Sequence, residues 1–491
     1  MWRALRAAAF FGYTWLAHTA WAQEFLPQAS LSTIYSDNPL RSNVSTGSAV
    51  VAEEDAGLRV FHNGPRFSID GTAGVAEREF VAGGRGTQTL PNANIDATAV
   101  LLPESLTFSA QDSLGQISTQ PFDVLDSVDR QTVNYLTAGP DAHFQIDSRD
   151  SIILDARYGA TTYQHSDINN GRYSGELGLA RQIGRRSAVS VNYNFERIQY
   201  EHSELFPTLQ KQVGFFRYTA QSSRTYLVAE AGEELMKITT SGAQKTTPHA
   251  TLALQRRVSP LMTFNAEFSH TFSDASEALQ TSLNDNFNSG TGNNQNVQAS
   301  ATPYVVNGGY LMLLRTTPVT STAAQVTFAT QRYQIIGATP TNSVSAINAL
   351  NRKLYGGNLV FDRRMSSLWT LAAQVRWTDT DYTNADTRYQ VVEASVGITR
   401  LLGRSVQAGL VYQHAHGTGN NQIYGFSENR VSLVISYAPG GAKSRIFDPV
   451  NEFRYYERPG RGPMPGQQLM PGQEPPVGSP LDENIPVSPP Q

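Results

Sequence analysis

Strict alternation of apolar and polar side chains is the feature that most constrains what this chain can fold into. It is clearest between Ser367 and Tyr382, where the apolar phase is formed by Trp369, Leu371, Ala373, Val375 and Trp377. A period of two is the period of a β-strand, because successive side chains point to opposite faces. The alternation recurs at 186–200, 263–272, 405–414 and 430–437, whereas helical periodicity is nearly absent after the N-terminus. The chain is therefore predicted to be all-β.

The lengths of these segments and the pattern of their connections indicate a membrane barrel. Soluble strands cluster near ~5–6 residues, whereas a tilted membrane strand needs about 9–11, a length that several segments reach. Short, often basic connections alternate with long ones rich in Asn, Gly and Ser. The short set comprises 181–187, 256–260, 363–367 and 400–405, and the long set comprises 274–301, 335–351 and 416–426. Tight turns at one end and long loops at the other are typical of outer-membrane barrels, whereas a soluble sandwich, the alternative, would not sort its loops by end.

Counting hairpins predicts about twenty strands, in a range of about 16 to 22. An even number is expected when both termini lie in the periplasm. The predicted fold class is thus an all-β, transmembrane, antiparallel up-and-down barrel. Its first strands are predicted at Pro27–Asp37, Asp55–His62, Arg66–Phe80 and Asn94–Leu102, and its last at Thr387–Thr399, Ser405–His414 and Glu428–Ala438.

Both ends of the chain differ in composition from the segments between them. Arg3 and Arg6 precede an apolar run and the small-residue sequence Ala20-Trp21-Ala22, which is the pattern of a secretory signal. About half of the 25 prolines follow Ala438, and proline cannot donate to a sheet ladder. We expect a signal peptide at 1–22, the barrel at 23–438 and a disordered, Pro-rich periplasmic tail at 439–491.

Aromatic residues near the strand ends predict where the barrel meets the membrane interfaces. Eight residues separate Trp369 from Trp377 on one face, which is roughly 26 Å along a strand and roughly 20 Å along the membrane normal at a tilt of about 40°. Trp and Tyr favour interfaces because one edge of the ring is apolar and the other is wet. The predicted interface aromatics are Phe195, Phe272, Trp369, Trp377, Tyr412 and Tyr437.

If the apolar phase meets lipid, the opposite phase lines the lumen. That wall would be hydrated and would carry both signs of charge, with no ring of a single sign that argues for ion selectivity. A wide barrel with such a lining is either a water-filled pore or a barrel plugged by its own loops or tail. The candidate lumen residues are Asp155, Arg157, Glu176, Asn192, Asn194, Glu196, Arg217, Glu267, Gln374, Arg376, Glu393 and Gln407.

Composition and motifs argue against several other functions. The chain has no cysteine, which excludes disulfides, thiolate metal sites and a cysteine nucleophile. Its net charge of −4 gives no electrostatic case for nucleic acid. His414-x-His416 lacks a third metal ligand nearby, and no GxSxG elbow precedes a helix. We expect no catalytic residues, no metal and no cofactor.

Two stretches carry a more specific pattern. The segment 25–42 runs into an aromatic-x-Asp-Asn turn at Tyr35-Ser36-Asp37-Asn38, and the segment 130–167 contains Gly139, Pro140, Arg157 and Tyr158. Both stretches resemble the β-barrel porin 2 group, which includes outer-membrane barrels encoded beside exopolysaccharide and exosortase (PEP-CTERM) systems. The resemblance covers about 25–438 and departs at the tail, because such barrels usually end on their last strand. It implies an outer-membrane channel serving polysaccharide export, with no established catalytic residue.

Two functions remain open from the sequence. The first is an outer-membrane channel of an exopolysaccharide export or secretion system in a Gram-negative cell. The second is a non-transporting anchor or adhesin barrel that presents long surface loops. The expected partners are outer-membrane lipid and lipopolysaccharide, together with a polysaccharide cargo and periplasmic export components, and no nucleic acid.

Overall fold

The described residues form twenty strands in the computed structural model. It describes residues 25–439 apart from 40, 42, 44–46, 82–85, 119–129, 204–205, 240, 275–300, 335–346 and 421–424. The strands are β1 (Phe25–Ser36), β2 (Ala49–Asn63), β3 (Phe67–Phe80), β4 (Thr87–Leu102), β5 (Leu106–Ser118), β6 (Arg130–Gln145), β7 (Asp150–Tyr163), β8 (Asn170–Gly184), β9 (Ser187–Tyr200), β10 (Leu209–Gln221), β11 (Thr225–Ile238), β12 (Gln244–Ser259), β13 (Met262–Ser273), β14 (Tyr304–Thr316), β15 (Thr320–Tyr333), β16 (Arg352–Arg364), β17 (Trp369–Tyr382), β18 (Thr387–Leu401), β19 (Val406–Gly419) and β20 (Phe426–Tyr437). In the described ranges, no helix has the length and apolar character that a membrane crossing requires.

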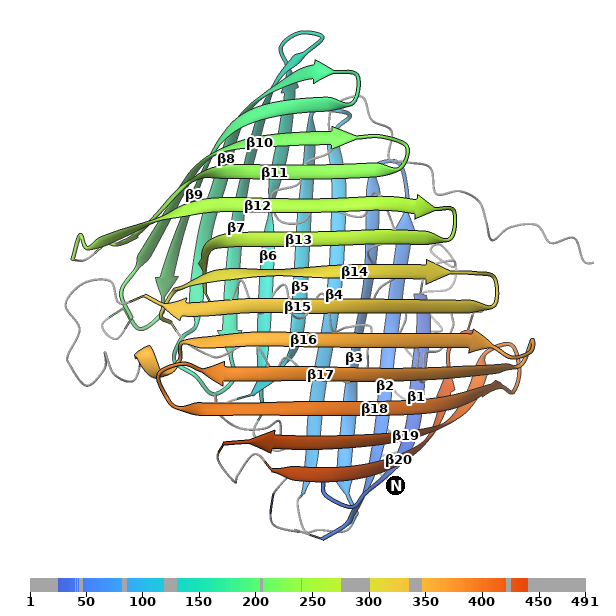
Figure 1. The fold of residues 1–491 in the computed structure, drawn as a ribbon. Coiled ribbons are helices and arrows are strands. Elements are labelled where there is room, and N and C mark those ends of the chain that lie inside the picture. The colour runs from blue at the N-terminus through green and yellow to red at the C-terminus, as the bar shows by residue number, and fades with distance from the viewer. Residues whose placement is uncertain are drawn as a thin grey trace, which may run out of the picture.

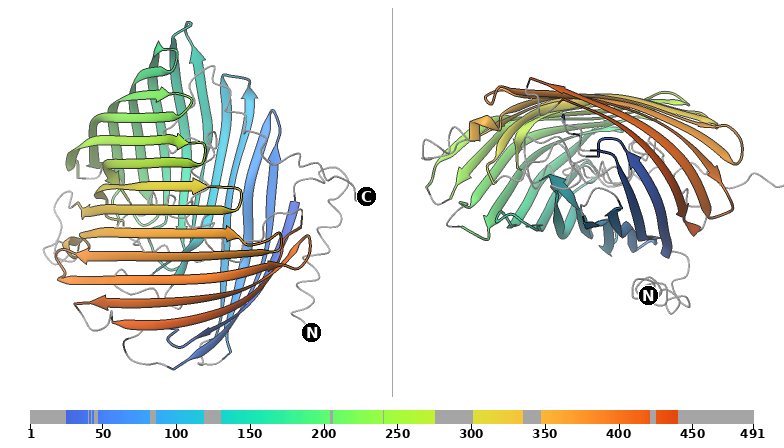
Figure 2. Two further views of the ribbon diagram at one scale, coloured as in Figure 1. Left: turned by 45° about the vertical axis from the view of Figure 1, so that its right-hand side comes forward. Right: turned by 90° about the horizontal axis from the view of Figure 1, so that it is seen from below.

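The strands form one closed antiparallel barrel. Each strand pairs with its neighbours in sequence, and β1 also pairs with β20, from Ala29 opposite Tyr437 to Ser36 opposite Arg430. Figure 2 shows the blue first strand beside the red last strand. The predictions of an all-β chain, an antiparallel barrel and about twenty strands are confirmed. Closure pairs the first strand with the last, so the described strands do not leave an open edge strand, which lipid would not tolerate.

Two of the first four strands, β2 and β4, are longer than the sequence pattern predicts. β2 begins at Ala49 rather than Asp55, and β4 begins at Thr87 rather than Asn94. In β2 the extra residues include Glu53, which pairs with Arg78 of the next strand on the inner side of the barrel. Charged residues on the inner phase make such a strand segment resemble a loop in sequence, because surface connections are also rich in ionised side chains.

The two ends of the barrel differ as predicted. At one end the connections are tight turns, none longer than residues 146–149 or 365–368. At the other end the connections include 274–303 and 334–351, and Figure 1 shows the tight turns of β10–β19 along one side of the molecule and their longer connections along the opposite side. Phe25 and Tyr437, the outer ends of the first and last strands, both lie at the short-turn end.

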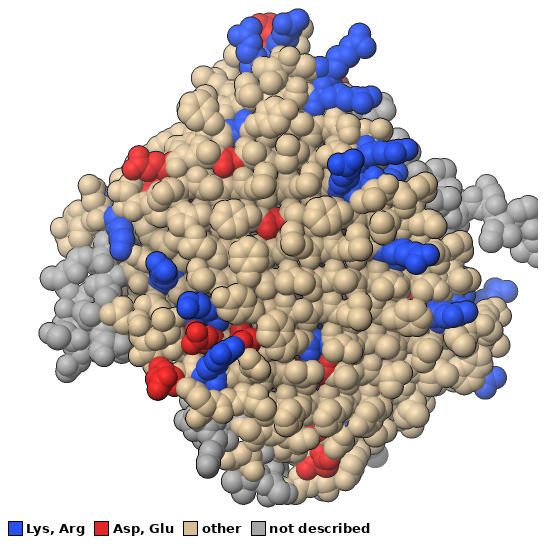
Figure 3. All heavy atoms as spheres, viewed as in Figure 1, with Lys and Arg blue, Asp and Glu red and all other residues tan. Residues whose placement is uncertain are grey.

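An apolar belt covers the outside of the barrel between its two rims. On β17, Trp369, Val375 and Trp377 are 38%, 47% and 38% exposed, and outward-facing apolar side chains of other strands, such as Leu177 and Leu433, are exposed as well. Figure 3 shows this surface as a broad zone with few charged side chains, most of which lie toward its edges. So large an exposed apolar surface on a closed barrel is the arrangement that contact with lipid requires.

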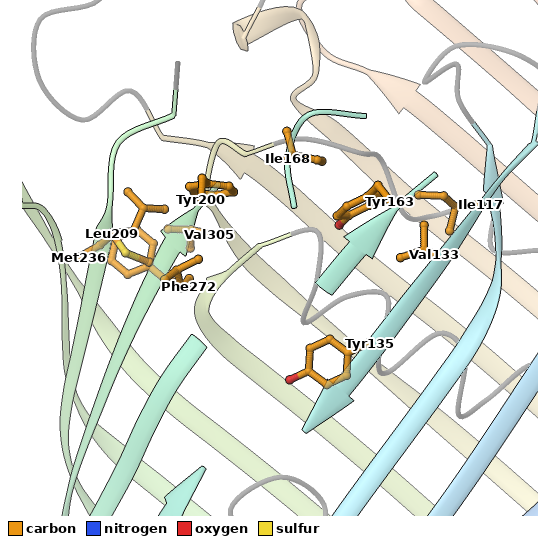
Figure 4. Packing of buried hydrophobic residues seen from close by; sticks show 11 residues of the cluster. Ile117, Val133, Tyr135, Tyr163, Ile168, Tyr200, Leu209, Met236, Phe272 and Val305 are labelled. Atoms are coloured by element: carbon orange, nitrogen blue, oxygen red, sulfur yellow. The ribbon is translucent and has the colours of Figure 1, made fainter. Parts of the chain in front are cut away.

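The buried apolar side chains of the described residues form separate clusters rather than one central core. The largest of these clusters lies near the long-loop end and contains residues of β5–β7, β9–β11, β13 and β14, several of which Figure 4 shows. The predicted signal peptide at 1–22 and, apart from Pro439, the predicted tail at 439–491 lie outside the described residues.

Candidate functional site on the inner wall of the barrel

The twelve predicted lumen residues all lie on the strand phase opposite to the exposed apolar residues. On β9, for example, Val191 and Tyr193 are exposed, whereas Asn192 between them is buried. The register extends this phase across neighbouring strands, since Glu267 is opposite Ala253, and Arg376 is opposite both Asn358 and Glu393. Their role as the wall of a water-filled passage stays a prediction.

Ion pairs link neighbouring and next-but-one strands across one sector of this wall, from β8 to β12. Arg217 of β10 lies 2.6 Å from a Glu230 carboxylate oxygen on β11 and 3.5 Å from Glu176 on β8. His249 of β12 lies 3.4 Å from the other Glu230 oxygen. All four side chains are mostly buried, so the pairs neutralise charges that would be costly to leave alone.

A second carboxylate in the same sector holds strands that are not neighbours. Glu234 of β11 is fully buried and lies 3.2 Å from the Lys211 ammonium. The other carboxylate oxygen of Glu234 accepts two hydrogen bonds from β13, one from the Thr271 hydroxyl at 2.9 Å and one from the Phe272 backbone N–H at 2.8 Å. The end of β13 thus reaches β11, although β12 separates the two strands elsewhere.

The connection between β13 and β14 starts and ends inside the long-loop end of the barrel, which we call its mouth. Asp274, directly after β13, forms an ion pair with Arg172 of β8, and Arg172 also lies 2.8 Å from Glu196 of β9. At the other end of the connection, the Tyr200 hydroxyl of β9 donates to the Ala301 carbonyl oxygen at 3.1 Å. Both described ends therefore contact the β8–β9 wall, which is four to five strands away from β13.

The apolar cluster near the long-loop end reinforces this arrangement. Phe272 and Val305, which flank the same connection, pack with Tyr200, Leu209 and Met236. Figure 4 shows these side chains gathered together, with Tyr163, Ile117 and Val133 forming a neighbouring group. Inward-pointing aromatic and aliphatic side chains therefore narrow this end of the barrel.

A polar clasp closes the barrel between β1 and β20, and it uses the Tyr35-Ser36-Asp37-Asn38 turn. The Ser36 hydroxyl donates to Glu428 at 2.7 Å, and the Asn38 side-chain amide donates to the Ser427 carbonyl oxygen at 3.1 Å. Tyr35 itself faces outward and is 47% exposed. The turn that carries the family resemblance is thus a structural fastening.

Arg41 lies beneath this clasp with a left-handed backbone, at a φ of 51°. Its guanidinium is 2.6 Å from Glu393 and 3.0 Å from Glu428, and it lies over the Phe426 ring. Burial by itself would lower the pKa of Arg41, but the two carboxylates outweigh it, so the pKa lies above its ordinary value. Arg41 is therefore held as a cation inside the mouth.

The second stretch of the resemblance forms a close approach between β6 and β7. A Cβ at Gly139 would lie 1.9 Å from the Ala156 carbonyl oxygen, so only glycine fits there. Arg157 donates to the Pro140 carbonyl oxygen at 3.0 Å and pairs with Asp141. Tyr158 points outward and packs against Tyr173 at a ring distance of 5.2 Å.

The predicted interface aromatics divide into two groups. Trp369, Trp377, Tyr412 and Tyr437 are 38–43% exposed on the outer phase, and Phe195 shares that phase on β9. Phe272 is fully buried in the mouth cluster. Because a side chain without exposed surface cannot contact lipid, the prediction for Phe272 is wrong; the inward turn of β13 at its end removes Phe272 from the outer phase.

Sequence reasoning missed several residues that organise the mouth, namely Arg41, Arg172 and Asp274. Period-two alternation carries a signal for Arg172, because it shares the inner phase of β8 with Glu176. Arg41 and Asp274 lie outside the strands, where alternation says nothing about direction. His414 and His416 lie on β19, where the His414 ring bonds Asn429 at 3.0 Å. Across the described residues, no three His, Asp or Glu side chains gather as a metal site would require.

No protein-family model and no curated protein sequence matches the chain. Among solved structures, it is similar to the FrpB iron transporter of Neisseria meningitidis, with 8% identity, a TM-score of 0.43, and 86% of this chain and 82% of that chain covered. It is also similar to a mutant of the ferric enterobactin receptor PfeA of Pseudomonas aeruginosa (8%, TM-score 0.42, 84% and 80% covered). The siderophore receptor PirA of the same organism gives 10% identity, a TM-score of 0.40, and 84% and 80% coverage. Likenesses this distant assign neither a family nor a ligand.

Proposed function

We propose that this chain is an outer-membrane channel for a hydrated polymer, working in an exopolysaccharide export or secretion system. The observation that carries the proposal is the division of the closed barrel into an exposed apolar outer phase and a polar, charge-balanced inner phase. In this arrangement the short turns lie in the periplasm, together with the outer ends of the first and last strands. The long connections lie on the outside of the cell.

The strand number supports a passage rather than a packed interior. Barrels of eight strands are filled by side chains, porins of 16–18 strands enclose water, and barrels of 22 strands hold a plug. Twenty strands lie between the last two classes. The inner wall pairs its charges locally, as Arg217 does with Glu230 and Arg78 does with Glu53. A wall of this kind favours weak charge selection.

The cargo is inferred from the resemblance to the β-barrel porin 2 group. The residues that carry this resemblance form the clasp between β1 and β20 and the close approach at Gly139, and these structural roles do not identify a cargo. A polar wall with paired charges suits a polysaccharide, because such a polymer keeps its hydration and needs only weak contacts. Periplasmic export components would meet the short-turn end in this proposal, and lipopolysaccharide would surround the opposite rim.

Single-channel recording tests the proposal. The purified full-length protein, inserted into a planar bilayer under a KCl gradient, is expected to conduct in uniform steps with a reversal potential close to zero. Dextran and alginate, a neutral and an anionic polymer, should both reduce the current when added to one side. Heat-unfolded protein serves as the control for leak. A correctly folded barrel that stays silent would overturn the channel.

Silence would instead favour the second candidate, a non-transporting anchor or adhesin. The inward contacts of the β13–β14 connection favour this candidate, because Arg172–Asp274 and the mouth cluster narrow the barrel at the long-loop end. The two functions separate on one measurement, since a narrowed pore still conducts in small steps and a plugged scaffold does not conduct.

A further inference from the structure

Five strands end in the same short pattern at the short-turn rim. Each carries apolar-x-apolar-x-Arg as it approaches its turn: LGLAR on β8, LALQR on β12, LMLLR on β14, LVFDR on β16 and VGITR on β18. We call the five arginines that close this pattern the arginine belt. They are Arg181, Arg256, Arg315, Arg363 and Arg400.

The belt continues the outer, apolar phase of the barrel. On β14, Leu311 and Leu313 are 53% and 42% exposed, and Arg315 follows two residues later on the same face. On β18, Val396 and Ile398 lead to Arg400 in the same way. All five arginines are exposed. They therefore stand on the outside of the barrel, where the apolar belt ends.

The register places these arginines at one level around the rim. Arg256 and Arg315 flank β13 opposite Phe264 and Met262, two residues apart. The same two-residue step separates the partners of Arg315 and Arg363 on β15, and those of Arg363 and Arg400 on β17. Two residues span roughly 7 Å along a strand, and two strands span roughly 10 Å across the sheet. The line that joins successive belt arginines therefore makes an angle of about 35° with the direction across the strands. Because membrane strands tilt by about 35–45°, this step keeps the arginines level with the membrane plane.

The level of the belt is that of the membrane interface. The Arg400 guanidinium lies 5.2 Å from the centre of the Trp369 ring, on the outer side of β17. Trp369 is 38% exposed and begins the apolar row that ends at Trp377. An interfacial tryptophan beside a guanidinium marks the depth of lipid headgroups.

The belt carries an excess of positive charge, because only one of its five arginines has a carboxylate partner among the described residues. Arg181 lies 3.7 Å from Asp150, and in the described part of the chain no carboxylate lies within ion-pair distance of the other four. Arg185, Arg186, Arg224 and Arg404 in the adjacent turns add to the charge. Figure 3 shows Lys and Arg along this rim, whereas both signs occur at the opposite rim, where Arg388 pairs with Asp379 at 2.5 Å.

We propose that the arginine belt binds the phosphates of anionic phospholipids in the leaflet at the short-turn end. A guanidinium offers paired donors that match a phosphate, and the basic residues in the turns beside the belt are also arginine rather than lysine. The one-sided position of the belt, from β8 to β18, would fix the depth and tilt of this sector of the barrel. This inference rests on the membrane-spanning arrangement of the proposed function.

The test measures the association of spin-labelled lipids with the reconstituted full-length protein. Vesicles of phosphatidylcholine receive a trace of spin-labelled phosphatidylglycerol or phosphatidylcholine, and the motionally restricted fraction gives the relative association constant. The belt variant is Arg256→Gln, Arg315→Gln, Arg363→Gln and Arg400→Gln together. The matched control removes four cations from the opposite rim: Arg197→Gln, Lys237→Gln, Arg332→Gln and Lys353→Gln.

The wild type is expected to prefer phosphatidylglycerol, and raising the salt concentration should weaken that preference. One basic residue near a lipid surface contributes about fivefold, so the belt variant should lose about tenfold or more while the control keeps the preference. Equal loss in both variants, or no preference in the wild type, would overturn the belt. Preference for labelled lipid A over phosphatidylglycerol, lost in the belt variant, would place the belt in the other leaflet and also overturn it. Failure to insert into any vesicle, read from heat-modifiable gel mobility, would instead contradict the proposed function.

Discussion

Asp37 and Asn429 are separated by 392 positions and fasten the first strand of the barrel to the last. The Asn429 backbone N–H and its side-chain amide each donate to one oxygen of the Asp37 carboxylate, both at 2.7 Å. The β1–β20 ladder they extend runs only from Ala29 to Ser36, whereas β1 pairs with β2 along its whole length from Phe25. Side-chain bonds therefore supplement the shortest ladder in the barrel.

Replacing Asp37 is expected to weaken this closure. Asp37→Ala removes two charge-assisted hydrogen bonds and should lower the free energy of unfolding by about 1–3 kcal/mol. Urea titration of the protein in detergent micelles, read by gel mobility, measures the change. Asp167→Ala, at an exposed loop carboxylate, is the matched control, and an equal effect there would show that Asp37 has no special role.

Arg41 should matter more than its neighbour Arg430, although both bind Glu428. Arg41 is 6% exposed and shared with Glu393, whereas Arg430 is 32% exposed. Arg41→Met leaves two carboxylates near the clasp without their buried cation and should cost about 3–5 kcal/mol. Arg430→Met should cost at most about 1 kcal/mol, because water screens the exposed pair. Thermal unfolding compares the two, and similar losses would contradict this ranking.

Neighbouring residues of β17 should respond oppositely to a new charge. Val375 faces outward between two interfacial tryptophans, and Gln374 faces inward toward Asn358. Val375→Arg places a guanidinium in the apolar belt, two residues from Trp377, and should destabilise the inserted barrel by about 1–3 kcal/mol, between the costs at the midplane and at the interface. Gln374→Arg should be tolerated. Unfolding from lipid vesicles measures both variants, and a harmless Val375→Arg would contradict lipid contact.

Breaking the Arg172–Asp274 pair should enlarge the mouth. Arg172→Gln frees Asp274 from the β8–β9 wall, so single-channel steps should become larger or noisier. Arg157→Gln is the control, because Arg157 also faces inward but pairs with Asp141 of the neighbouring strand. If the two variants change the conductance equally, the cause is wall charge rather than the position of the connection.

The turn between β6 and β7 should keep its structure well into acid. Backbone N–H groups of Arg149 and Asp150 donate to the Asp147 carboxylate at 2.7 and 2.8 Å and lower the pKa of that carboxyl. Since the folded pKa lies below the unfolded one, this contribution is complete at neutral pH and is lost as the pH falls through the folded value. A carboxyl ¹³C titration should give Asp147 a lower midpoint than a peptide of residues 144–152, and equal midpoints would contradict it.

The inner wall and the apolar belt could be predicted because the alternation of side chains along a strand is a local property. In a strand such as β9, placing Val191 outward fixes Asn192 inward by backbone geometry alone, whatever the rest of the chain does. The same logic placed Trp369 and Trp377 on one outer row. It failed at Phe272, where β13 turns inward at its end and the phase no longer determines direction.

The sequence by itself determined that this chain forms long two-faced strands joined by alternating short and long connections, because side-chain direction and turn chemistry depend only on near neighbours. Only the tertiary structure decided where the barrel closes and what narrows its mouth. Asp37 meets Asn429, and Arg172 meets Asp274, because register accumulates around twenty strands before the two ends meet. A one-residue slip in any ladder would turn that strand over and separate these partners. No local sequence pattern records the combined register of all the ladders.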